Sequence, residues 1–315
     1  MPRSPEILVL TPQIHPTALA ALDAAFATHH LWEAADRAAC LAALAGRVEG
    51  IATGLGAVVD AALMDGLPKL RIVATNTVGV DAIDLAAARA RGIVVTNTPD
   101  ILTDCTADLG MALTLALARR LCEADRFVRA GFWRRGPFGY STKLGGKTMG
   151  IVGMGRIGQA VARRAAAFDM AIAYHGPRAK PDLPFRYYAD LAALAAASDV
   201  LMLTTPGGAA TRDLINARIL AALGPSGYLV NIARGSVVDE PAMVRMLQEG
   251  NLGGAGLDVF VEEPRVPEAL FALENVVLLP HVGSATHATR AAMGQLVVDN
   301  LVAQFAGKPL LTPVA

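Results

Sequence analysis

A glycine-rich segment at residues 147–159 constrains the fold of this chain more than any other part of the sequence. An apolar run at residues 149–152 predicts a buried parallel strand, and Gly153, Gly155 and Gly158 follow it in G-x-G-x-x-G spacing. The first glycine permits a tight turn, the second lets a pyrophosphate approach the backbone, and the third lets helix and strand pack closely.

The residues after these glycines have a helical pattern over positions 156–168. The first of them, Arg156 and Ile157, would offer unpaired backbone N–H groups at the positive end of the helix dipole, where a phosphate binds well. The glycine spacing alone is a weak signal, but here a strand precedes it and a helix follows it, as the motif requires. We therefore expect this unit to bind a dinucleotide.

The length and composition indicate a well-packed protein of two domains. A chain of 315 residues exceeds one typical core, and 53% hydrophobic with 18% charged residues is no signature of disorder. Zero net charge argues against a nucleic-acid partner. The longest apolar stretch, at residues 109–118, is about half of a membrane span, and the N-terminus has no signal-peptide core. Cys40, Cys105 and Cys122 form no C-x-x-C pair, so we expect a reducing, cytoplasmic environment.

Predicted strands and helices alternate along the chain. The first part has strands at 6–10, 50–53, 70–75 and 92–96, with helices at 16–28, 58–67 and 84–91. The second has six strands, at 149–152, 171–174, 200–204, 228–232, 254–259 and 276–279, with connecting helices at 191–197, 217–223 and 240–249. This alternation predicts an α/β protein with two Rossmann-like, doubly wound parallel sheets: a flavodoxin-like substrate domain and an NAD(P)-binding domain, with a cleft between them.

The predicted domain boundaries fall near a proline turn and near the last helix. Asn97-Thr98-Pro99 ends the first unit, and one long helix is predicted at 102–130, either as a dimer surface or as an internal core helix. An amphipathic helix at 288–305 is expected to pack back on the first unit. The substrate domain would then comprise residues 1–98 and 287–315, and the cofactor domain residues 99–286.

The end of the strand at 171–174 indicates which dinucleotide is bound. NAD is usually held by an Asp or Glu about 20 residues past the glycines. Here residues 174–180 read YHGPRAK, and no carboxylate occurs before Asp182. Arg178 would attract the 2′-phosphate of NADP, with His175 or Lys180 helping, unless these cations only form a solvated loop. We expect NADP(H) to be favoured over NAD(H).

Three polar residues follow predicted strands of the second unit, at the sheet edge where ligands bind in such folds. They are Arg234, Glu263 and His281. The arginine can grip a carboxylate and polarise a carbonyl, and the histidine can act as general acid and base. The glutamate can orient the imidazole and favour its protonated form.

Other interpretations of these residues stay open. Arg234 could be a structural ion-pair partner, His281 a buried core histidine, and Glu262 rather than Glu263 the acidic partner. Asp258 could simply cap a strand end. No metal site is expected, because four further histidines have no ligand spacing; they are His15, His29, His30 and His287.

Six segments together resemble the D-2-hydroxyacid dehydrogenase family. They read NTVGVDAID, NTPDILTDCTADL, VGMGRIGQ, NIARGSVVDE, AGLDVFVEEP and PHVGSAT. The likeness covers about residues 70–300 and is strongest to glyoxylate/hydroxypyruvate reductases and their 2-ketogluconate reductase relatives. It implies NADPH-dependent reduction of small 2-oxo acids such as glyoxylate and hydroxypyruvate to D-2-hydroxy acids, with His281 donating the proton.

The same resemblance implies residue roles and a homodimer. Arg234, Glu263 and His281 would be the catalytic trio, and the backbone N–H groups of Val78 and Gly79 would hold the substrate carboxylate beside Arg234. The residues implied around the cofactor are Asp258 on the nicotinamide carboxamide, Thr106, Ala233 and Gly283 near the nicotinamide, and Pro206 on the adenine side. A 2-ketogluconate reductase is the alternative enzyme. A dinucleotide-sensing binding protein, as in transcriptional corepressors, is an alternative of another class.

Overall fold

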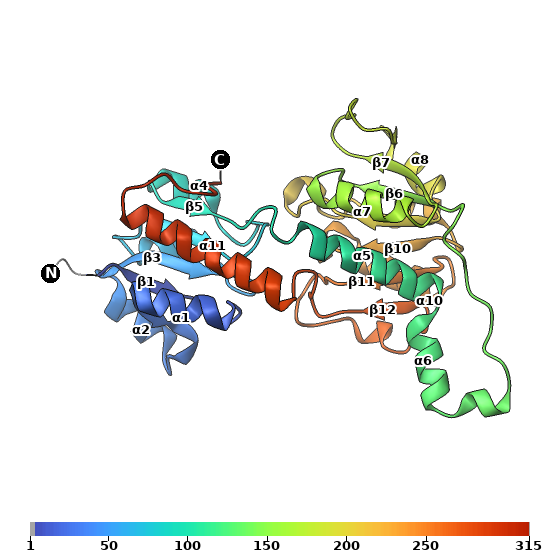
Figure 1. Ribbon diagram of the computed structural model, residues 1–315, viewed down its shortest axis with the longest axis horizontal. Helices are drawn as coiled ribbons and strands as arrows, with labels where there is room; N and C mark the ends of the chain where they lie inside the picture. The colour runs from blue at the N-terminus through green and yellow to red at the C-terminus, as the bar shows by residue number, and fades with distance from the viewer. Residues whose placement is uncertain (1–3, 315) are drawn as a thin grey trace. The chain divides into compact units, whose positions relative to one another are not determined.

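The computed structural model describes residues 4–314 and divides into two compact units, each built on one sheet (Figure 1). Unit 1 comprises the chain up to Leu102 together with the chain from Ser284 onward, and unit 2 is Thr103–Gly283. All strand pairs within both sheets are parallel, which confirms the predicted α/β class.

Unit 1 has a five-stranded sheet in the order β2-β1-β3-β4-β5. The strands are β1 (Glu6–Val9), β2 (Ala27–His30), β3 (Val48–Thr53), β4 (Ile72–Thr75) and β5 (Val94–Thr96). The helices are α1 (Pro16–Ala25), α2 (Arg37–Leu44), α3 (Ala61–Asp65), α4 (Leu85–Ala90) and α11 (His287–Phe305), with the 3-10 turn η1 (Leu31–Glu33).

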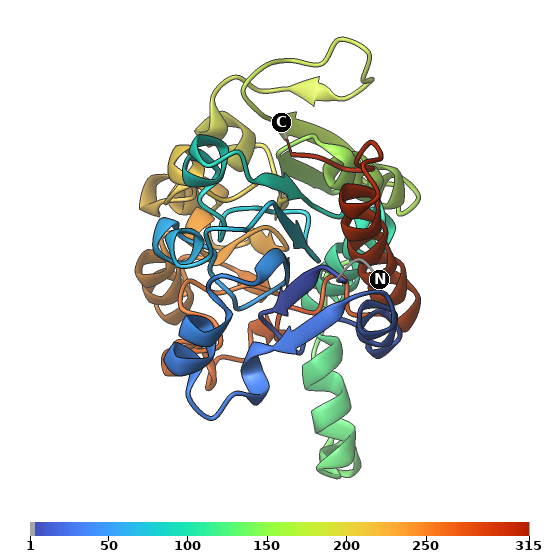
Figure 2. The same cartoon turned by 90° about the vertical axis from the view of Figure 1, so that its left-hand side faces the viewer.

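Strand alternation divides the apolar residues of unit 1 between the two faces of the sheet. Ile7 and Val9 of β1 pack under α1 and α11, whereas Leu8 packs under α2, α3 and α4. Both faces are therefore covered by helices, as Figure 2 shows for the blue strands and the red α11. The last helix belongs to unit 1.

Two elements of unit 1 were absent from the sequence prediction. The helix predicted at 16–28 ends at Ala25, because Phe26 is extended and Ala27–His30 then pairs with β1 as β2. Helix α2 was not predicted either. Its N-cap is Asp36, whose carboxylate accepts from Ala39 N. β2 is the edge strand of the sheet, and its sequence, ATHH, has too few apolar residues to predict a strand.

Unit 2 has a seven-stranded sheet in the order β12-β11-β10-β9-β6-β7-β8. The strands are β6 (Thr148–Val152), β7 (Ala171–His175), β8 (Arg186–Tyr187), β9 (Val200–Leu203), β10 (Tyr228–Asn231), β11 (Gly254–Leu257) and β12 (Val276–Leu278). The helices are α5 (Thr103–Ala118), α6 (Leu121–Arg129), α7 (Arg156–Ala166), α8 (Leu191–Ala196), α9 (Ala217–Leu223) and α10 (Glu240–Gln248), with 3-10 turns η2 (Phe132–Arg135), η3 (Ala209–Thr211), η4 (Gly235–Val237) and η5 (Glu268–Leu270). The prediction of six strands missed β8, whose two residues are too short for a sequence pattern.

The single long helix predicted at 102–130 is wrong. Helix α5 ends at Ala118, Arg120 takes a left-handed φ of 53°, and α6 starts in a new direction at Leu121. The corner is stabilised from far along the chain, because Thr142 N donates to Ala118 O at 2.8 Å and Arg120 Nη1 donates to Tyr140 O at 3.1 Å. Of the two helices, α5 is the internal one, with eight of its residues buried, whereas α6 has none.

Candidate active site

The glycine loop lies where the strand order of unit 2 reverses, between β6 and β9, which is the position where open α/β sheets bind ligands. Gly153 has a φ of +98°, and a Cβ there would lie 2.7 Å from Thr205 N. A Cβ on Gly158 would lie 2.3 Å from Gly153 O. A Cβ on Gly155 would meet nothing within 4 Å, so the backbone at the second glycine faces open space. This is the arrangement that a pyrophosphate requires.

The N-terminus of α7 is available to an anion. Gly155 is the N-cap residue and no side chain caps the helix. In contrast, Asp or Asn side chains cap α8, α9 and α10 of the same unit. An uncapped helix start beside open space fits a phosphate group, so unit 2 fits the dinucleotide that its glycine spacing predicts.

A threonine that the sequence analysis missed anchors this loop. Thr204, directly after β9, donates from Oγ1 to Gly153 O at 2.5 Å, and its N–H donates to Val152 O at 2.9 Å. Pro206 follows two residues later, and its carbonyl accepts from Thr211 Oγ1 at 2.8 Å. The sequence feature that could have indicated this role is the position of Thr204, directly after the strand that pairs with β6.

The loop after β7 carries the residues predicted to bind the 2′-phosphate on the adenosine ribose of NADP. His175 Nδ1 donates to Tyr188 O at 3.0 Å, so the ring is held by the backbone near β8. Lys180 N donates to the Tyr174 hydroxyl at 2.6 Å, which fixes the far end of the loop. Arg178 is exposed between them, and within residues 4–314 it has no carboxylate partner. The loop therefore presents a cation where NAD-specific proteins present a carboxylate.

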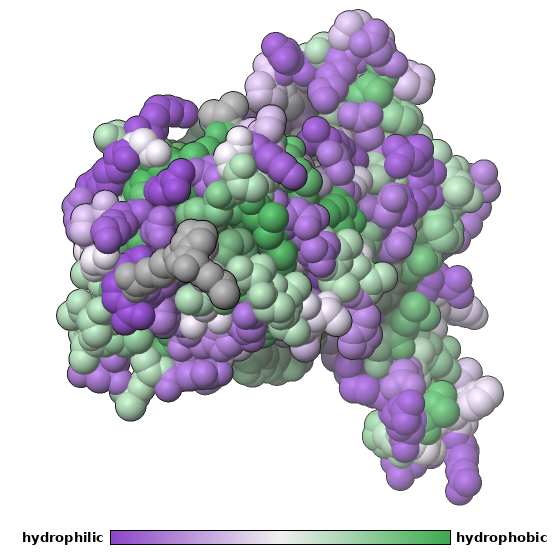
Figure 3. Space-filling view, turned by 60° about the vertical axis from the view of Figure 1, so that its left-hand side comes forward, coloured by the Kyte–Doolittle hydropathy of each residue, from purple (hydrophilic) through white to green (hydrophobic). Residues whose placement is uncertain are grey.

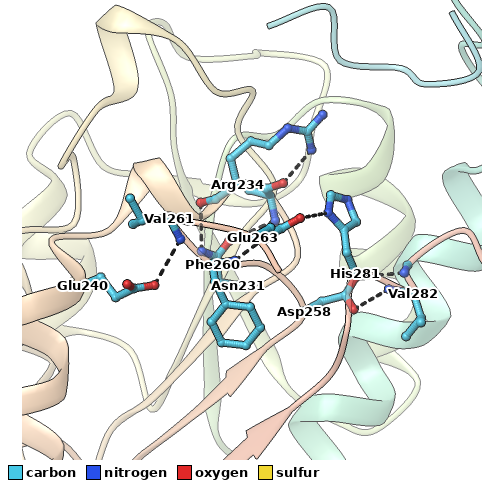
Figure 4. A network of polar contacts seen from close by, with 11 residues as sticks. Asn231, Arg234, Glu240, Asp258, Phe260, Val261, Glu263, His281 and Val282 are labelled. Atoms are coloured by element: carbon cyan, nitrogen blue, oxygen red, sulfur yellow. Dashed lines mark hydrogen bonds and ion pairs between the residues drawn. The ribbon is translucent and has the colours of Figure 1, made fainter. Parts of the chain in front are cut away.

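Glu263 and His281 form a hydrogen-bonded pair. Glu263 Oε2 lies 2.7 Å from His281 Nδ1, and Glu263 Oε1 accepts from Phe260 N at 2.9 Å (Figure 4). Burial raises the pKa of Glu263, but the bond to His281, the Phe260 N–H and the Arg234 charge outweigh it and lower that pKa below 4.5.

The ionised carboxylate determines which imidazole nitrogen can react. An ionised carboxylate can only accept hydrogen bonds, so Nδ1 of His281 must carry the hydrogen in this pair. Nε2 is then the nitrogen that can give or take a proton, and it makes no hydrogen bond within the described residues. Glu262, the alternative acidic residue, instead pairs with Arg265 at 3.2 Å.

Asp258 holds the turn that carries His281. His281 has a left-handed φ of 55°, and its N–H donates to Asp258 O at 2.9 Å. The carboxylate of Asp258, which is 2% exposed, accepts from Val282 N at 2.7 Å and from Gly283 N at 2.8 Å. Burial raises the pKa of Asp258, and these two N–H groups and the nearby His281 charge offset the shift only in part. The carboxylate of Asp258 thus anchors the backbone of the turn that carries His281.

Arg234 leaves the end of β10 in a turn that Asn231 organises. Asn231 Nδ2 donates to Arg234 O and its Oδ1 accepts from Ala233 N, both at 3.0 Å. A Cβ on Gly235 would lie 2.0 Å from the carbonyl carbon of Phe260, so this turn lies directly against the turn that bears Glu263. In Figure 4 the Arg234 side chain extends on the same side of these turns as the His281 ring. Asn231 was not among the site residues predicted from the sequence.

The remaining predicted site residues fall in both units. Thr106 lies beside Gly283, since a Cβ on Gly283 would be 3.5 Å from the Thr106 methyl carbon. Val78 and Gly79 lie in unit 1, in the turn after β4. Among residues 4–314 there is no group of three or more His, Cys, Asp or Glu that could hold a metal, and no helix is long and apolar enough to cross a membrane.

Together, an imidazole paired with a carboxylate, a guanidinium and a glycine-rich dinucleotide loop are the groups that a hydride-transfer site can use.

Comparison with known proteins identifies the family. The model of the D-isomer specific 2-hydroxyacid dehydrogenase NAD-binding domain matches residues 111–283. Hydroxyphenylpyruvate reductase of Plectranthus scutellarioides is 51% identical over 293 residues, covering 93% of this chain and 94% of that protein. The 2-ketogluconate reductase of Gluconobacter oxydans is 43% identical over 314 residues, covering 100% of both.

A solved structure gives the same result. The NADPH-dependent glyoxylate/hydroxypyruvate reductase of Sinorhizobium meliloti, in complex with NADP and malonate, superposes with a TM-score of 0.91 at 46% identity, covering 99% of this chain and 97% of that one. The resemblance carried by the six motifs is confirmed: the chain belongs to the D-isomer specific 2-hydroxyacid dehydrogenase family.

Proposed function

We propose that this protein reduces small 2-oxo acids, glyoxylate and hydroxypyruvate among them, to D-2-hydroxy acids with NADPH. The observation that carries this proposal is the Glu263–His281 pair, which leaves Nε2 open in the unit that holds the dinucleotide loop. The family supports the reaction type, and the NADPH-dependent reductase of S. meliloti supports the substrate and cofactor class.

In this proposal the residues of the trio divide the chemistry between them. His281 Nε2 donates a proton to the oxygen of the C2 carbonyl, while Glu263 holds Nδ1 and balances the charge of the imidazolium. Arg234 grips the substrate carboxylate and stabilises negative charge on the carbonyl oxygen, and the N–H groups of Val78 and Gly79 complete the carboxylate site. The reduced nicotinamide supplies the hydride when it is bound.

We assign the cofactor to unit 2. Gly153, Gly155 and Gly158, with the N–H groups at Arg156 and Ile157, would hold the pyrophosphate. The nicotinamide end would lie against Thr106, Ala233, Asp258 and Gly283, and the adenine side against Pro206. The exposed Arg178 and the oriented His175 favour the 2′-phosphate of NADP over the unsubstituted ribose of NAD.

We also propose a homodimer in the cytoplasm. Helix α6 projects from the sheet of unit 2 (Figure 1), buries none of its residues and exposes Leu121 and Val128, and Trp133 in the turn beyond it is 68% exposed. In Figure 3 this projecting segment, at lower right, carries apolar patches among polar ones. A second copy of the chain is the partner that would cover such a surface. Cys40, Cys105 and Cys122 form no disulfide within residues 4–314, which suits a reducing compartment.

A sugar 2-oxo acid such as 2-ketogluconate is the second candidate substrate, because the 2-ketogluconate reductase of G. oxydans aligns along its full length. Both substrates would use the same trio.

The test is the loss of reduced-nicotinamide absorbance, with NADPH and NADH in parallel and with glyoxylate, hydroxypyruvate and 2-ketogluconate. Faster turnover with NADPH and one of the first two acids, lost in His281→Ala, is the expected result. Best turnover of 2-ketogluconate would replace the substrate assignment, and a faster reaction with NADH would overturn the cofactor assignment. No turnover of any acid, with tight dinucleotide binding retained, would favour a non-catalytic binding protein.

A further inference from the structure

We infer that the C-terminal tail, residues 311–314, positions the backbone loop that we propose for the substrate carboxylate. This inference rests on the proposed function of that loop, and every contact in it lies within unit 1. We call residues 77–79 the carboxylate loop and residues 311–314 the tail. The positioning residues are Asn300, Thr312 and Asn97, which connect α11 to the loop through consecutive hydrogen bonds.

The carboxylate loop has its three carbonyl groups occupied and two N–H groups available. Thr77 O accepts from Thr98 N at 2.9 Å, Val78 O accepts from Asn97 Nδ2 at 2.7 Å, and Gly79 O accepts from Thr77 Oγ1 at 2.6 Å. The N–H groups of Val78 and Gly79 have no partner among residues 4–314. Occupied carbonyls keep the negative ends of these peptides away from a ligand, so the loop can present two donors to an anion.

The tail holds Asn97, the residue that orients the middle peptide of this loop. Thr312 Oγ1 donates to Asn97 O at 2.6 Å, and Asn97 N donates to Thr312 O at 3.2 Å. Val314 N donates to Val95 O at 2.8 Å, so the tail lies along the free edge of β5, as Figure 1 shows. Thr312 thus bonds both the N–H and the carbonyl group of Asn97, although the two residues are 215 positions apart.

A buried amide on α11 fixes the tail in turn. Asn300 is 1% exposed, and its Nδ2 donates to Leu296 O at 2.8 Å and to Thr312 Oγ1 at 3.0 Å. Its Oδ1 accepts from Leu311 N at 3.0 Å and from Thr312 N at 3.2 Å. With both donors and both lone pairs used, this amide allows the tail one position only.

The Thr312 hydroxyl is the link through which α11 acts on the loop. It accepts from Asn300 and gives its only hydrogen to Asn97 O. Without the Thr312 hydroxyl, the carbonyl group of Asn97 loses a hydrogen bond that holds it in place. The Asn97 side chain is then less firmly positioned when its Nδ2 donates to Val78 O. The two N–H groups would then be less well aimed, which weakens carboxylate binding while the proton donor and cofactor loop, in unit 2, stay unchanged.

The test substitutes Thr312→Val, which keeps the shape and removes the hydroxyl, and Thr312→Ser, which restores it. We expect Thr312→Val to raise KM for glyoxylate and the inhibition constant of malonate about fivefold or more, with kcat within about twofold and the NADPH Kd unchanged. Thr312→Ser should restore KM. Thr28→Val makes the same substitution in β2, at the opposite edge of the sheet, and should leave KM unchanged.

A double-mutant cycle separates positioning from general stability. Asn97→Ala should raise KM at least as much as Thr312→Val, and adding Thr312→Val to it should raise KM no further, because both act on the same peptide. Additive effects, an unchanged KM in a folded Thr312→Val protein, or an equal effect of Thr28→Val would overturn the inference. Absence of 2-oxo acid turnover in the unmodified protein would instead refute the proposed function.

Discussion

At the scale of single residues, the charge of Glu263 is the property on which the proposed proton transfer depends most. Glu263→Gln keeps the size of the side chain and removes the anion that faces His281 Nδ1. We expect kcat/KM for reduction to fall about 100-fold, because the imidazolium loses the anion that balances its charge during proton transfer. Steady-state kinetics of reduction measures this loss.

The same variant has a predicted stability profile. The pKa of Glu263 in the folded protein lies below the ordinary 4.5, so the ionised carboxylate stabilises the fold above about pH 4.5, and this contribution disappears as the pH falls through the lowered value. Glu263→Gln should therefore lower Tm at pH 7 and differ less from the natural protein in acid. Glu262→Gln, a neighbouring change in an exposed ion pair, is the control and should change neither kcat/KM nor Tm.

Arg178 is the residue that should set the cofactor preference. A charge-assisted contact to a phosphate is worth about 1.5–3 kcal/mol, so Arg178→Ser should raise KM for NADPH about 10- to 100-fold and change KM for NADH little. Steady-state kinetics with both cofactors measures this. Arg218→Ser, at an arginine that is 75% exposed on α9, provides the matched control. Equal losses with both cofactors would contradict a 2′-phosphate contact.

At the scale of elements, the three glycines around the start of α7 should differ in what they contribute. Gly158→Ala places a Cβ 2.3 Å from Gly153 O, a backbone atom that cannot swing aside. We expect a loss of about 1–3 kcal/mol in the free energy of unfolding, or more, measured by urea denaturation. Thermal unfolding should likewise show a lower Tm for Gly158→Ala than for the unmodified protein.

Gly155→Ala tests the second glycine separately. Its φ is −77° and a Cβ there meets nothing within 4 Å, so the substitution should leave stability nearly unchanged. It should nevertheless weaken NADPH binding, because the Cβ occupies the open space beside the helix start. Fluorescence titration of NADPH gives the affinity. Unimpaired binding in a folded Gly155→Ala protein would place the pyrophosphate elsewhere.

At the scale of the whole molecule, the surface of α6 predicts association. Light scattering should give about twice the 32.7 kDa mass of the chain. Val128→Glu introduces a charge on α6 and should shift the mass toward that of one chain. Val58→Glu changes a valine of unit 1 that is 66% exposed and should leave the dimer intact. A single-chain mass for the unmodified protein would exclude α6 as a homodimer surface.

Much of the fold could be predicted because its signals are local. The glycine turn, the apolar runs of β6 and β9 and the Asp and Asn caps of short helices each depend on neighbouring residues. The trio could be proposed because residues that directly follow parallel strands gather at one sheet edge. Arg120 has no such signal: neither glycine nor proline marks the break, and its partner Tyr140 is twenty residues away.

The sequence by itself determined the α/β class, the dinucleotide loop, the family and the identity of the proposed general acid and base, its carboxylate partner and the guanidinium. Only the tertiary structure decided which atoms face one another: that Glu263 rather than Glu262 meets His281, that Thr204 and Asn231 anchor the loops, and that Thr312 reaches Asn97. The physical reason is the separation along the chain between the residues that interact. Periodicity, turns and caps arise within a few residues, whereas a hydrogen bond across 215 positions has no local pattern and exists only once the chain has folded.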